Sequence, residues 1–202
     1  MLQEFPSSTA AAPDALLQAE LREHRASFEA TAQMLSGPFA ETLDILETGL
    51  RRGGKLMLFG NGGSAADCQH IAAELIIRYK SDRAAISAIA LTTDSSALTA
   101  CGNDFGFDAL FERQIAGLGR PDDVAVGLST SGNSPNVLKG LRQARSMGLK
   151  TVGLSGATGG GMPELCDGVI LVPSAVTARI QEMHIFIGHA WCKALEQRLG
   201  LV

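Results

Sequence analysis

Two kinds of hydrophobic pattern divide the chain near residue 53. Before it, apolar positions recur at helical spacing over residues 15–35 and 38–52, and Gly53 and Gly54 end the second predicted helix. Beyond it, short apolar runs alternate with helical stretches, and the runs cover residues 55–59, 85–91, 124–128, 151–154 and 169–172. This alternation is typical of parallel strands that are joined by crossover helices and covered on both faces. We therefore predict an α/β fold, a three-layer αβα sandwich with a central five-stranded parallel sheet of the flavodoxin-like type and extra N-terminal helices.

Length and local composition set the expected domain organisation. The chain has 202 residues, which is enough for one well-buried core, so we expect residues 15–202 to form a single domain. Residues 1–14 are rich in Ser, Ala and Pro and predict a flexible N-terminal tail. No apolar run reaches the roughly 20 residues of a membrane helix, and the first residues lack the basic start and apolar stretch of a signal peptide. We expect a cytoplasmic protein that makes no contact with a membrane.

Charge and cysteine content exclude further classes. The formal net charge is −4, and Lys and Arg are scattered along the chain, so no basic surface is expected to bind nucleic acid. The four cysteines show no CxxC spacing and lie among apolar or small residues. This context predicts free thiols rather than disulfides or a catalytic thiol.

Two Gly- and Ser-rich segments follow strands of the predicted sheet. The sequence GNGGSAAD begins after the first strand, and its glycines permit a tight turn. We expect Ser64 to cap the next helix, with Asp67 as its capping-box partner. The sequence STSGNSPN begins after the third strand, and Pro135 suits the first position of the following helix. This second segment supplies four hydroxyl groups, those of Ser129, Thr130, Ser131 and Ser134.

Free N–H groups, hydroxyl groups and helix N-termini together favour an anion. Either loop alone is explained more simply as a well-capped turn, since Ser, Gly and Asn are common in turns. Two such loops after two strands of one sheet instead favour a phosphate site, because ligands of open parallel sheets bind at the carboxyl ends of the strands. Neither loop has the GxxxxGK[ST] or GxGxxG pattern of nucleotide binding. We therefore expect a small phosphorylated metabolite.

The helix predicted over residues 64–79 carries a candidate acid–base pair. Its apolar positions form one stripe that must face the core: Cys68, Ile71, Ala72, Leu75, Ile76 and Tyr79. His70 and Glu74 lie one turn apart on the opposite face, so an imidazole and a carboxylate can reach one metal ion or exchange protons with a ligand. In isolation, a solvated His–Glu pair is the simpler interpretation. The location favours a functional role, because the helix begins at the first candidate phosphate loop.

The last helix, predicted over residues 178–199, contains two histidines in different surroundings. His184 falls within the core stripe and is expected to be a buried structural residue; the stripe comprises Ile180, Met183, Ile187, Trp191, Ala194 and Leu195. His189 projects opposite the stripe and is the better catalytic candidate, with Gln181 between the two faces. The helix is apolar nearly all round, as buried helices are. We therefore expect it to pack against another subunit.

Together these motifs resemble one family. The segments GNGGSAAD, QHIAAE, GNDFGF, STSGNSPN and TARIQEMHIFIGH occur in this order within residues 40–200 and resemble the sugar isomerase (SIS) domain family, and within it the phosphoheptose isomerases. Members of that family are cytoplasmic homotetramers with active sites at their subunit interfaces. The resemblance implies the SIS-type form of the predicted fold and a homo-oligomer, expected to be a homotetramer with active sites at subunit interfaces.

The resemblance also implies roles for particular residues. Glu74 and His189 match the family's acid and base residues, and one zinc ion per subunit is implied, with the ligands His70, Glu74, Gln181 and His189. The residues implied in substrate binding are Asn61, Gly62, Gly63, Ser64, Glu74, Asn103, Asp104, Ser129, Thr130, Ser131, Ser134 and Gln181. Ala178 stands where some members place an aspartate, so a supporting acid at that point is missing here.

The reaction implied by the resemblance converts D-sedoheptulose 7-phosphate into D-glycero-D-manno-heptose 7-phosphate, the first step toward the heptose of lipopolysaccharide or related glycans. Acid and base groups can move the proton through an enediolate, and zinc would stabilise the developing oxyanion. Two alternatives stay open. One is a non-catalytic SIS-domain tetramer that binds the bacterial replication initiator protein and typically lacks counterparts of Glu74 and His189. The other is an isomerase of another sugar phosphate.

Overall fold

The strands form a single parallel sheet. The computed structural model describes residues 12–202, which contain five strands in the order β2-β1-β3-β4-β5. They are β1 (Leu56–Gly60), β2 (Ala88–Ala90), β3 (Val124–Ser129), β4 (Lys150–Gly156) and β5 (Gly168–Val172). All neighbouring strands are parallel. The predicted five-stranded parallel sheet and its flavodoxin-like order are confirmed.

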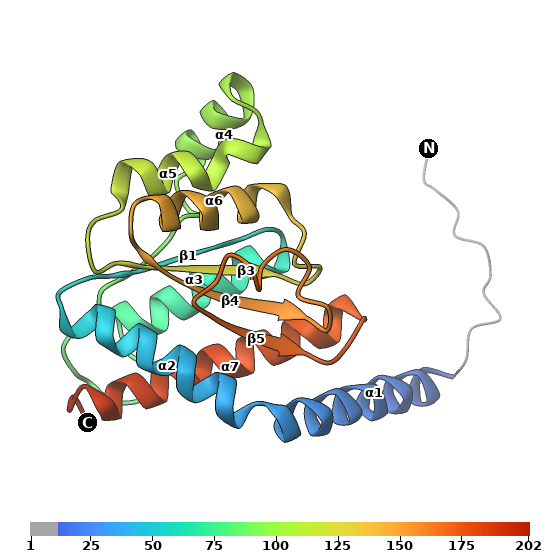
Figure 1. Ribbon diagram of the computed structural model, residues 1–202. Coiled ribbons are helices and arrows are strands. Elements are labelled where there is room, and N and C mark those ends of the chain that lie inside the picture. Colours follow the sequence, from blue (N-terminus) through green and yellow to red (C-terminus); the bar gives the residue numbers. More distant parts are fainter. Residues whose placement is uncertain (1–11) are drawn as a thin grey trace.

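Helices cover both faces of this sheet, as Figure 1 shows. One layer holds α1 (Pro13–Met34), α2 (Ser36–Arg51), α3 (Gly63–Ile76) and α7 (Thr177–Arg198). The other holds α5 (Leu110–Leu118) and α6 (Pro135–Ser146), with α4 (Ser95–Asp104) and the short 3-10 helix η1 (Phe107–Ala109) beyond them. A separate apolar core lies on each side of the sheet. The predicted three-layer αβα sandwich is confirmed.

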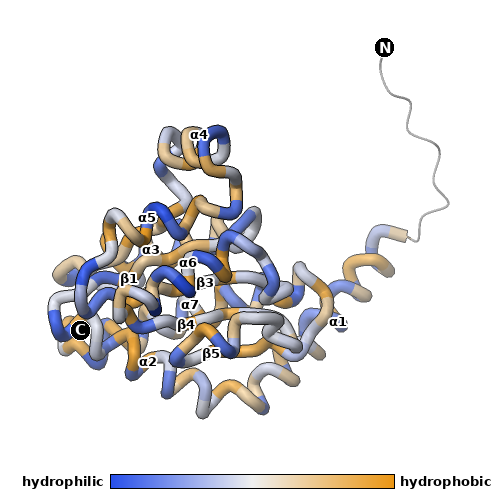
Figure 2. Tube along the Cα trace, turned by 45° about the horizontal axis from the view of Figure 1, so that its top comes forward, coloured by the Kyte–Doolittle hydropathy of each residue, from blue (hydrophilic) through white to orange (hydrophobic). Residues whose placement is uncertain are grey.

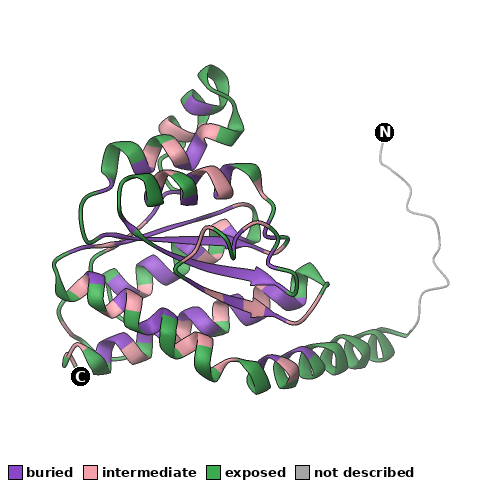
Figure 3. Ribbon diagram, viewed as in Figure 1, coloured by how far each residue is buried: buried purple, intermediate pink, exposed green. Residues whose placement is uncertain are grey.

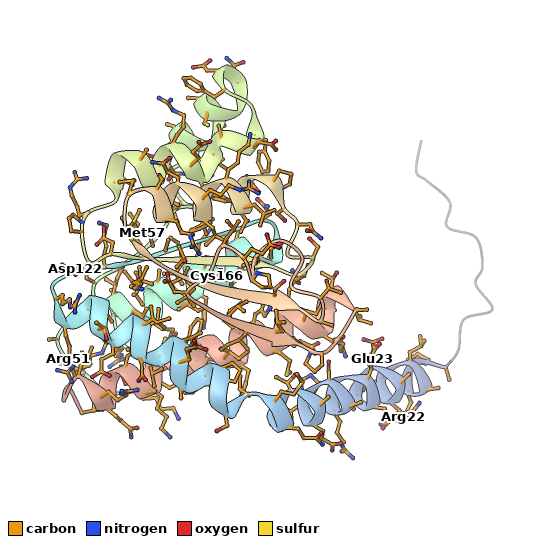
Figure 4. All side chains as sticks on the ribbon, viewed as in Figure 1. Arg22, Glu23, Arg51, Met57, Asp122 and Cys166 are labelled. Atoms are coloured by element: carbon orange, nitrogen blue, oxygen red, sulfur yellow. The ribbon has the colours of Figure 1, made fainter. Side chains whose placement is uncertain are left out.

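The loops after β1 and β3 leave the sheet side by side. Gly60 of β1 pairs in register with Leu128 of β3, so the two strands end at the same edge. The chain adds β2 on one side of β1 and β3 on the other, and such a switch point leaves a crevice in which ligands bind. Figure 4 places Arg51 and Asp122 at the opposite end of the sheet, where the strands begin. The fold therefore brings the two predicted phosphate loops together.

The N-terminal helix extends away from the body of the protein. α1 begins at Pro13, so the expected tail is wrong for Pro13 and Asp14; its residues 1–11 lie outside the described part of the chain. Residues 13–26 are exposed (Figure 3), and they carry both apolar and polar side chains (Figure 2). Within residues 12–202, no helix combines the length and the apolar character needed to cross a membrane.

The connection from α3 to β2 differs from the prediction. α3 ends at Ile76 rather than at residue 79, so Tyr79 reaches the core from an irregular segment. The carbonyl of Leu75 accepts hydrogen bonds from the Ile86 N–H and from the Arg83 guanidinium instead of continuing the helix. β2 contains only three residues and is shorter than the apolar run over residues 85–91.

Candidate active site

Two asparagines join the predicted phosphate loops. Asn61, after β1, and Asn136, in the first turn of α6, exchange two side-chain hydrogen bonds of 2.8 Å. Asn136 is buried, and its Oδ1 also accepts a hydrogen bond of 2.9 Å from the Val137 N–H. The pair fixes the end of β1 beside the end of β3. Sequence reasoning identified Asn61 but missed Asn136, although Asn136 is the last residue of the STSGNSPN segment; only the strand order indicates that the two face each other.

Three of the four hydroxyl groups after β3 lie close together. Ser129 Oγ lies 3.0 Å from Ser134 Oγ and 3.5 Å from Ser131 Oγ. The Ser155 hydroxyl of β4 donates to the Ser129 carbonyl at 2.8 Å and fixes the end of the strand. α6 begins at Pro135, which confirms the predicted first helical position. A helix N-terminus therefore adjoins the hydroxyl cluster, and this combination favours an anion.

Backbone contacts hold residues 129–134, the serine loop, against the loop after β4. Thr130 is half-buried, and its carbonyl accepts a hydrogen bond of 3.1 Å from the Gly156 N–H. Gly132 has a φ of +67°, and a Cβ at this position would lie 1.9 Å from the carbonyl oxygen of Gly159. Glycine is therefore required at 132 both by the dihedral angle and by the available space.

The predicted capping box at the start of α3 is wrong. The helix begins at Gly63, Gly62 is the N-cap residue with a φ of +55°, and no side chain caps the helix. Because Gly62 starts the helix early, Ser64 already lies within the first turn, where it is buried. A Cβ on Gly60 would lie 2.9 Å from Ser64 Cβ, so these residues are in close contact. No side chain caps this first turn of α3, and an uncapped helix N-terminus favours an anion.

The structure brings His70 of α3 and His189 of α7 together. Their Nε2 atoms are 2.8 Å apart, so one ring donates a proton to the other. Glu74 Oε1 lies 3.6 Å from His70 Nε2. Burial lowers the pKa of His189, the nearby His70 lowers it further, and Glu74 opposes both effects. An imidazole pair and a carboxylate from two helices thus meet at one point, although only His70 and Glu74 are close in sequence.

Gln181 lies at the start of the second turn of α7. Its side-chain amide packs against Gly63, where a Cβ would lie 2.5 Å from Gln181 Nε2. Gln181 is therefore placed at the first phosphate loop rather than beside the imidazole pair. In residues 12–202, no three His, Cys, Asp or Glu side chains form a closed metal-binding group. The donor types nevertheless suit zinc, since two imidazole nitrogens already converge with a carboxylate oxygen nearby.

Two of the residues predicted to bind substrate lie away from the imidazole pair of their own chain. Asn103 and Asp104 end α4, which packs on η1 and α5 rather than on α3 or α7. Both are exposed, and the Asn103 Nδ2 atom donates to Asp104 Oδ1 at 2.7 Å. A single copy of the described chain therefore does not bring these two residues to the imidazole pair.

Asp67 is a member of this region that the sequence did not identify as functional. It lies three residues before His70 on α3, and burial raises its pKa to about 6 while His70 acts in the opposite direction. Its Oδ2 atom is buried without a hydrogen-bond partner among the described residues. The helical spacing to His70 was the available signal, but we expected this carboxylate to serve as a cap.

His184 has the structural role that its place in the core stripe predicts. The side chain is fully buried, and its Nε2 atom lies 3.3 Å from the Ser155 carbonyl. Burial lowers its pKa to about 4, and the hydrogen bond to Ser155 offsets only part of this effect. The ring is therefore neutral at pH 7 and supports the strand that positions the serine loop.

Acidification is expected to destabilise the protein through His184. The unfolded chain binds a proton at this residue below its ordinary pKa of 6.5, whereas the folded protein does so only near 4. Stability is therefore lost as the pH falls through this window, by about 2 kcal/mol between pH 7 and pH 5. Urea unfolding at both pH values should show a smaller loss for His184→Gln, which keeps a donor for Ser155. Equal losses in both proteins would contradict this assignment.

Comparison with known proteins identifies close relatives over most of the chain. A family model for the SIS domain matches residues 21–156. A phosphoheptose isomerase from Paramagnetospirillum magneticum is 53% identical over 180 residues, which cover 89% of this chain and 94% of that protein. Phosphoheptose isomerase 1 from Campylobacter jejuni is 50% identical over 182 residues, which cover 90% of this chain and 97% of that protein.

Solved structures agree with these sequence relatives. A phosphoheptose isomerase from Neisseria gonorrhoeae superposes with a TM-score of 0.87 at 39% identity, covering 92% of this chain and all (100%) of that chain. A phosphoheptose isomerase from Francisella tularensis gives a TM-score of 0.89 at 32% identity, covering 93% and 100%. Sequence and structure thus indicate the same group of proteins over the same length of chain.

Proposed function

The chain belongs to the SIS domain family and, within it, to the phosphoheptose isomerases, and from this premise we propose how its residues divide between a phosphate-binding end and a proton-transferring end. It is an enzyme that interconverts the aldose and ketose forms of a heptose phosphate. The reaction we propose is conversion of D-sedoheptulose 7-phosphate into D-glycero-D-manno-heptose 7-phosphate, as the first step of heptose synthesis for lipopolysaccharide or related glycans.

The phosphate-binding end is the crevice between β1 and β3. The Ser129 hydroxyl lies 3.0 Å from that of Ser134 and 3.5 Å from that of Ser131, and this cluster adjoins the N-terminus of α6. The uncapped first turn of α3 faces the same crevice from β1. Hydroxyl and N–H donors at two helix N-termini are suited to a phosphate ester. We assign the phosphate to the serine loop, and substrate contacts after β1 to the backbone of Asn61, Gly62 and Gly63, because the Asn61 amide is held by Asn136.

The proton-transferring end is the cluster of Glu74 and His189. Moving the carbonyl from C2 to C1 requires one proton to leave C1 and one to arrive at C2, with further exchange on the two oxygens. A carboxylate and an imidazole from facing helices can remove and return these protons through an enediolate. The observation that carries this assignment is the convergence of His70 with His189 at 2.8 Å, which places α3 and α7 side by side at the substrate crevice.

One zinc ion per subunit fits the donor types at this end. His70, Glu74 and His189 supply two imidazole nitrogens and a carboxylate oxygen, and the carboxamide of Gln181, which contacts Gly63 at the start of α3, would supply the fourth donor. When bound, zinc polarises the substrate carbonyl and stabilises negative charge on its oxygen. We propose these four side chains as the ligands.

One experiment tests both the proposed zinc ion and the proposed substrate. Purified protein incubated with D-sedoheptulose 7-phosphate should form an aldose of identical mass, detected by NMR. Treatment with a chelator should lower the rate by at least about 100-fold, and added zinc should restore it, because stabilisation of a developing oxyanion contributes factors of this size. Full activity in metal-free protein would exclude the zinc assignment without affecting the family membership.

We also propose a homotetramer in the cytoplasm with active sites at subunit interfaces. An apolar groove of about 340 Å³ runs between α1, α2 and α7, and Phe28, Phe39, Met183 and Phe186 line it. Leu17 of α1 is 55% exposed and Phe186 of α7 is 43% exposed, a pattern that favours association. Free thiols at all four cysteines suit a reducing compartment. Light scattering of the purified protein should give four times the chain mass; a monomer would contradict this proposal.

Formation of the oligomer would also give α4 a role in substrate binding. Asn103 and Asp104 are exposed at the end of this protruding helix, away from the cluster of their own chain. We propose that they contact the substrate only in the assembled oligomer. A variant that stays monomeric should then lose activity even though its serine loop and imidazole pair are intact.

A further inference from the structure

A buried ion pair ties α3 to α7 beside the reacting side chains. Nε of Arg83, in the segment between α3 and β2, lies 2.8 Å from Oε1 of Glu196 on α7. The two side chains are 0% and 4% exposed. Burying two charges is a weak source of stability, because the loss of hydration offsets their attraction. Stability alone therefore does not explain this pair.

The remaining nitrogens of Arg83 hold the end of α3. Nη2 donates to the carbonyl of Glu74 at 2.8 Å, and Nη1 donates to the carbonyl of Leu75 at 2.6 Å. The last carbonyls of a helix lack partners within it, and a positive charge is favourable there. Arg83 thus fixes the backbone of Glu74, whose carboxylate faces the imidazole pair.

Glu196 acts on the other side of the cluster. Its Oε1 atom accepts a hydrogen bond of 3.2 Å from the Tyr79 N–H. The Tyr79 ring packs on the His189 ring, with centroids 5.5 Å apart and planes inclined by 32°. Glu196 also follows His189 by seven residues, two turns along the same face of α7. One network therefore reaches both the backbone of Glu74 and the ring of His189.

From this network we infer that Arg83 and Glu196 are positioning residues for the isomerisation: they fix the separation of α3 and α7 and hold Glu74 and His189 at the spacing that proton transfer requires. The inference rests on the proposed roles of Glu74 and His189. Proton transfer requires donor and acceptor within about 3 Å, and a displacement of about 1 Å can cost about 100-fold in rate. The effect falls on kcat, because the hydrogen bonds of the pair join α3, α7 and the segment between α3 and β2, whereas the phosphate binds at the serine loop.

The test replaces the whole pair with apolar residues. Arg83→Met/Glu196→Leu avoids an unpaired buried charge, but it also removes the donors to the Glu74 and Leu75 carbonyls. We expect a folded protein with a melting temperature lowered by no more than about 10 °C, a kcat lowered about 10- to 100-fold, a KM within about two-fold and zinc affinity lowered about 10-fold or more in competition with a chromogenic chelator. A folded double variant with parental kcat and zinc affinity would overturn the inference.

Two further variants keep the test decisive. Arg198→Met/Asp44→Asn removes the two ion pairs, each of 2.7 Å, that Arg198 of α7 makes with Asp44 and Glu47 of α2 rather than with α3; its kcat should stay parental. If the first double variant does not fold, Glu196→Gln keeps the shape and an acceptor but loses the charge. Its kcat should fall at least about three-fold, and a parental value would overturn the inference.

Failure of the proposed function has a different signature. If Glu74→Gln and His189→Ala stay active, the proposed acid–base cluster is wrong. If those variants are inactive but the Arg83 and Glu196 variants match the parent, only the positioning role is wrong.

Discussion

Glu74→Gln is expected to lower kcat by at least about 10³-fold while the protein stays folded. The substitution keeps the size of the side chain but removes a group that can accept and return a proton, and acid–base groups contribute about 10² to 10⁴ in rate. It also weakens a proposed zinc ligand. Steady-state measurement of kcat with D-sedoheptulose 7-phosphate checks the prediction, and His189→Ala should have an effect of similar size because it removes the partner imidazole.

Asp82→Asn is the matched control for this prediction. It makes the same change from carboxylate to carboxamide six residues beyond the end of α3, where the side chain is 91% exposed and pairs with Arg78. Its kcat should stay within about two-fold of the parent, because exposed ion pairs contribute little. All three variants should melt within about 5 °C of the parent. Unfolding of both Glu74→Gln and His189→Ala would instead indicate that the cluster is structural.

The fold could be predicted largely because its signals are local. Every residue of β1 and of β3 is buried, and a strand covered on both faces shows as a short continuous apolar run. The ends of helices and strands are harder to predict where a contact with a residue distant in sequence determines them. α3 ends at Ile76 because Arg83 and Ile86 take its last carbonyls, and neither residue belongs to the helical pattern.

The residues of the candidate site also fall into two groups, those that local spacing predicts and those that it does not. Residues close in sequence, such as His70 with Glu74 or Ser129 with Ser134, were identified from their spacing. Pairs that join distant segments were not: Asn61 and Asn136 are 75 residues apart, and Arg83 and Glu196 are 113 apart. Such contacts depend on strand order and helix packing, which spacing along the chain does not encode. The burial of His184 and the partial exposure of His189 could be predicted because both histidines lie on one helix, where 100° per residue separates the core face from the opposite face.

Membership of the phosphoheptose isomerases also settles the alternatives left open by the sequence. The relatives that cover about nine-tenths of this chain are phosphoheptose isomerases, which favours a heptose phosphate over another sugar phosphate. Glu74 and His189 are both present, and His189 meets His70 across two helices. A chain that only bound a protein partner would not need this convergence of the two imidazoles.

Gly132→Ala is expected to lower the stability of the protein and to damage the proposed phosphate site. The φ of +67° disfavours any residue with a Cβ, and the new methyl group would lie 1.9 Å from the Gly159 carbonyl oxygen, a backbone atom that cannot rotate away. The strained dihedral and the forced displacement together should cost about 2 to 4 kcal/mol in the free energy of unfolding, measured with urea. Because Ser131 and Ser134 flank Gly132, KM for the phosphorylated substrate should rise at least about 10-fold, equivalent to about 1.4 kcal/mol of binding.

Gly148→Ala separates the effect of the positive φ on stability from the effect of the steric contact with Gly159. Gly148 has a similar φ of +78°, but nothing lies within 4 Å of the position that a Cβ would take. It lies between α6 and β4, away from the serine loop, so its substitution should cost only about 1 kcal/mol and leave KM unchanged. The difference between the two variants measures the steric contact between the serine loop and the loop after β4. If both variants lose the same stability and keep the parental KM, that contact does not shape the phosphate site.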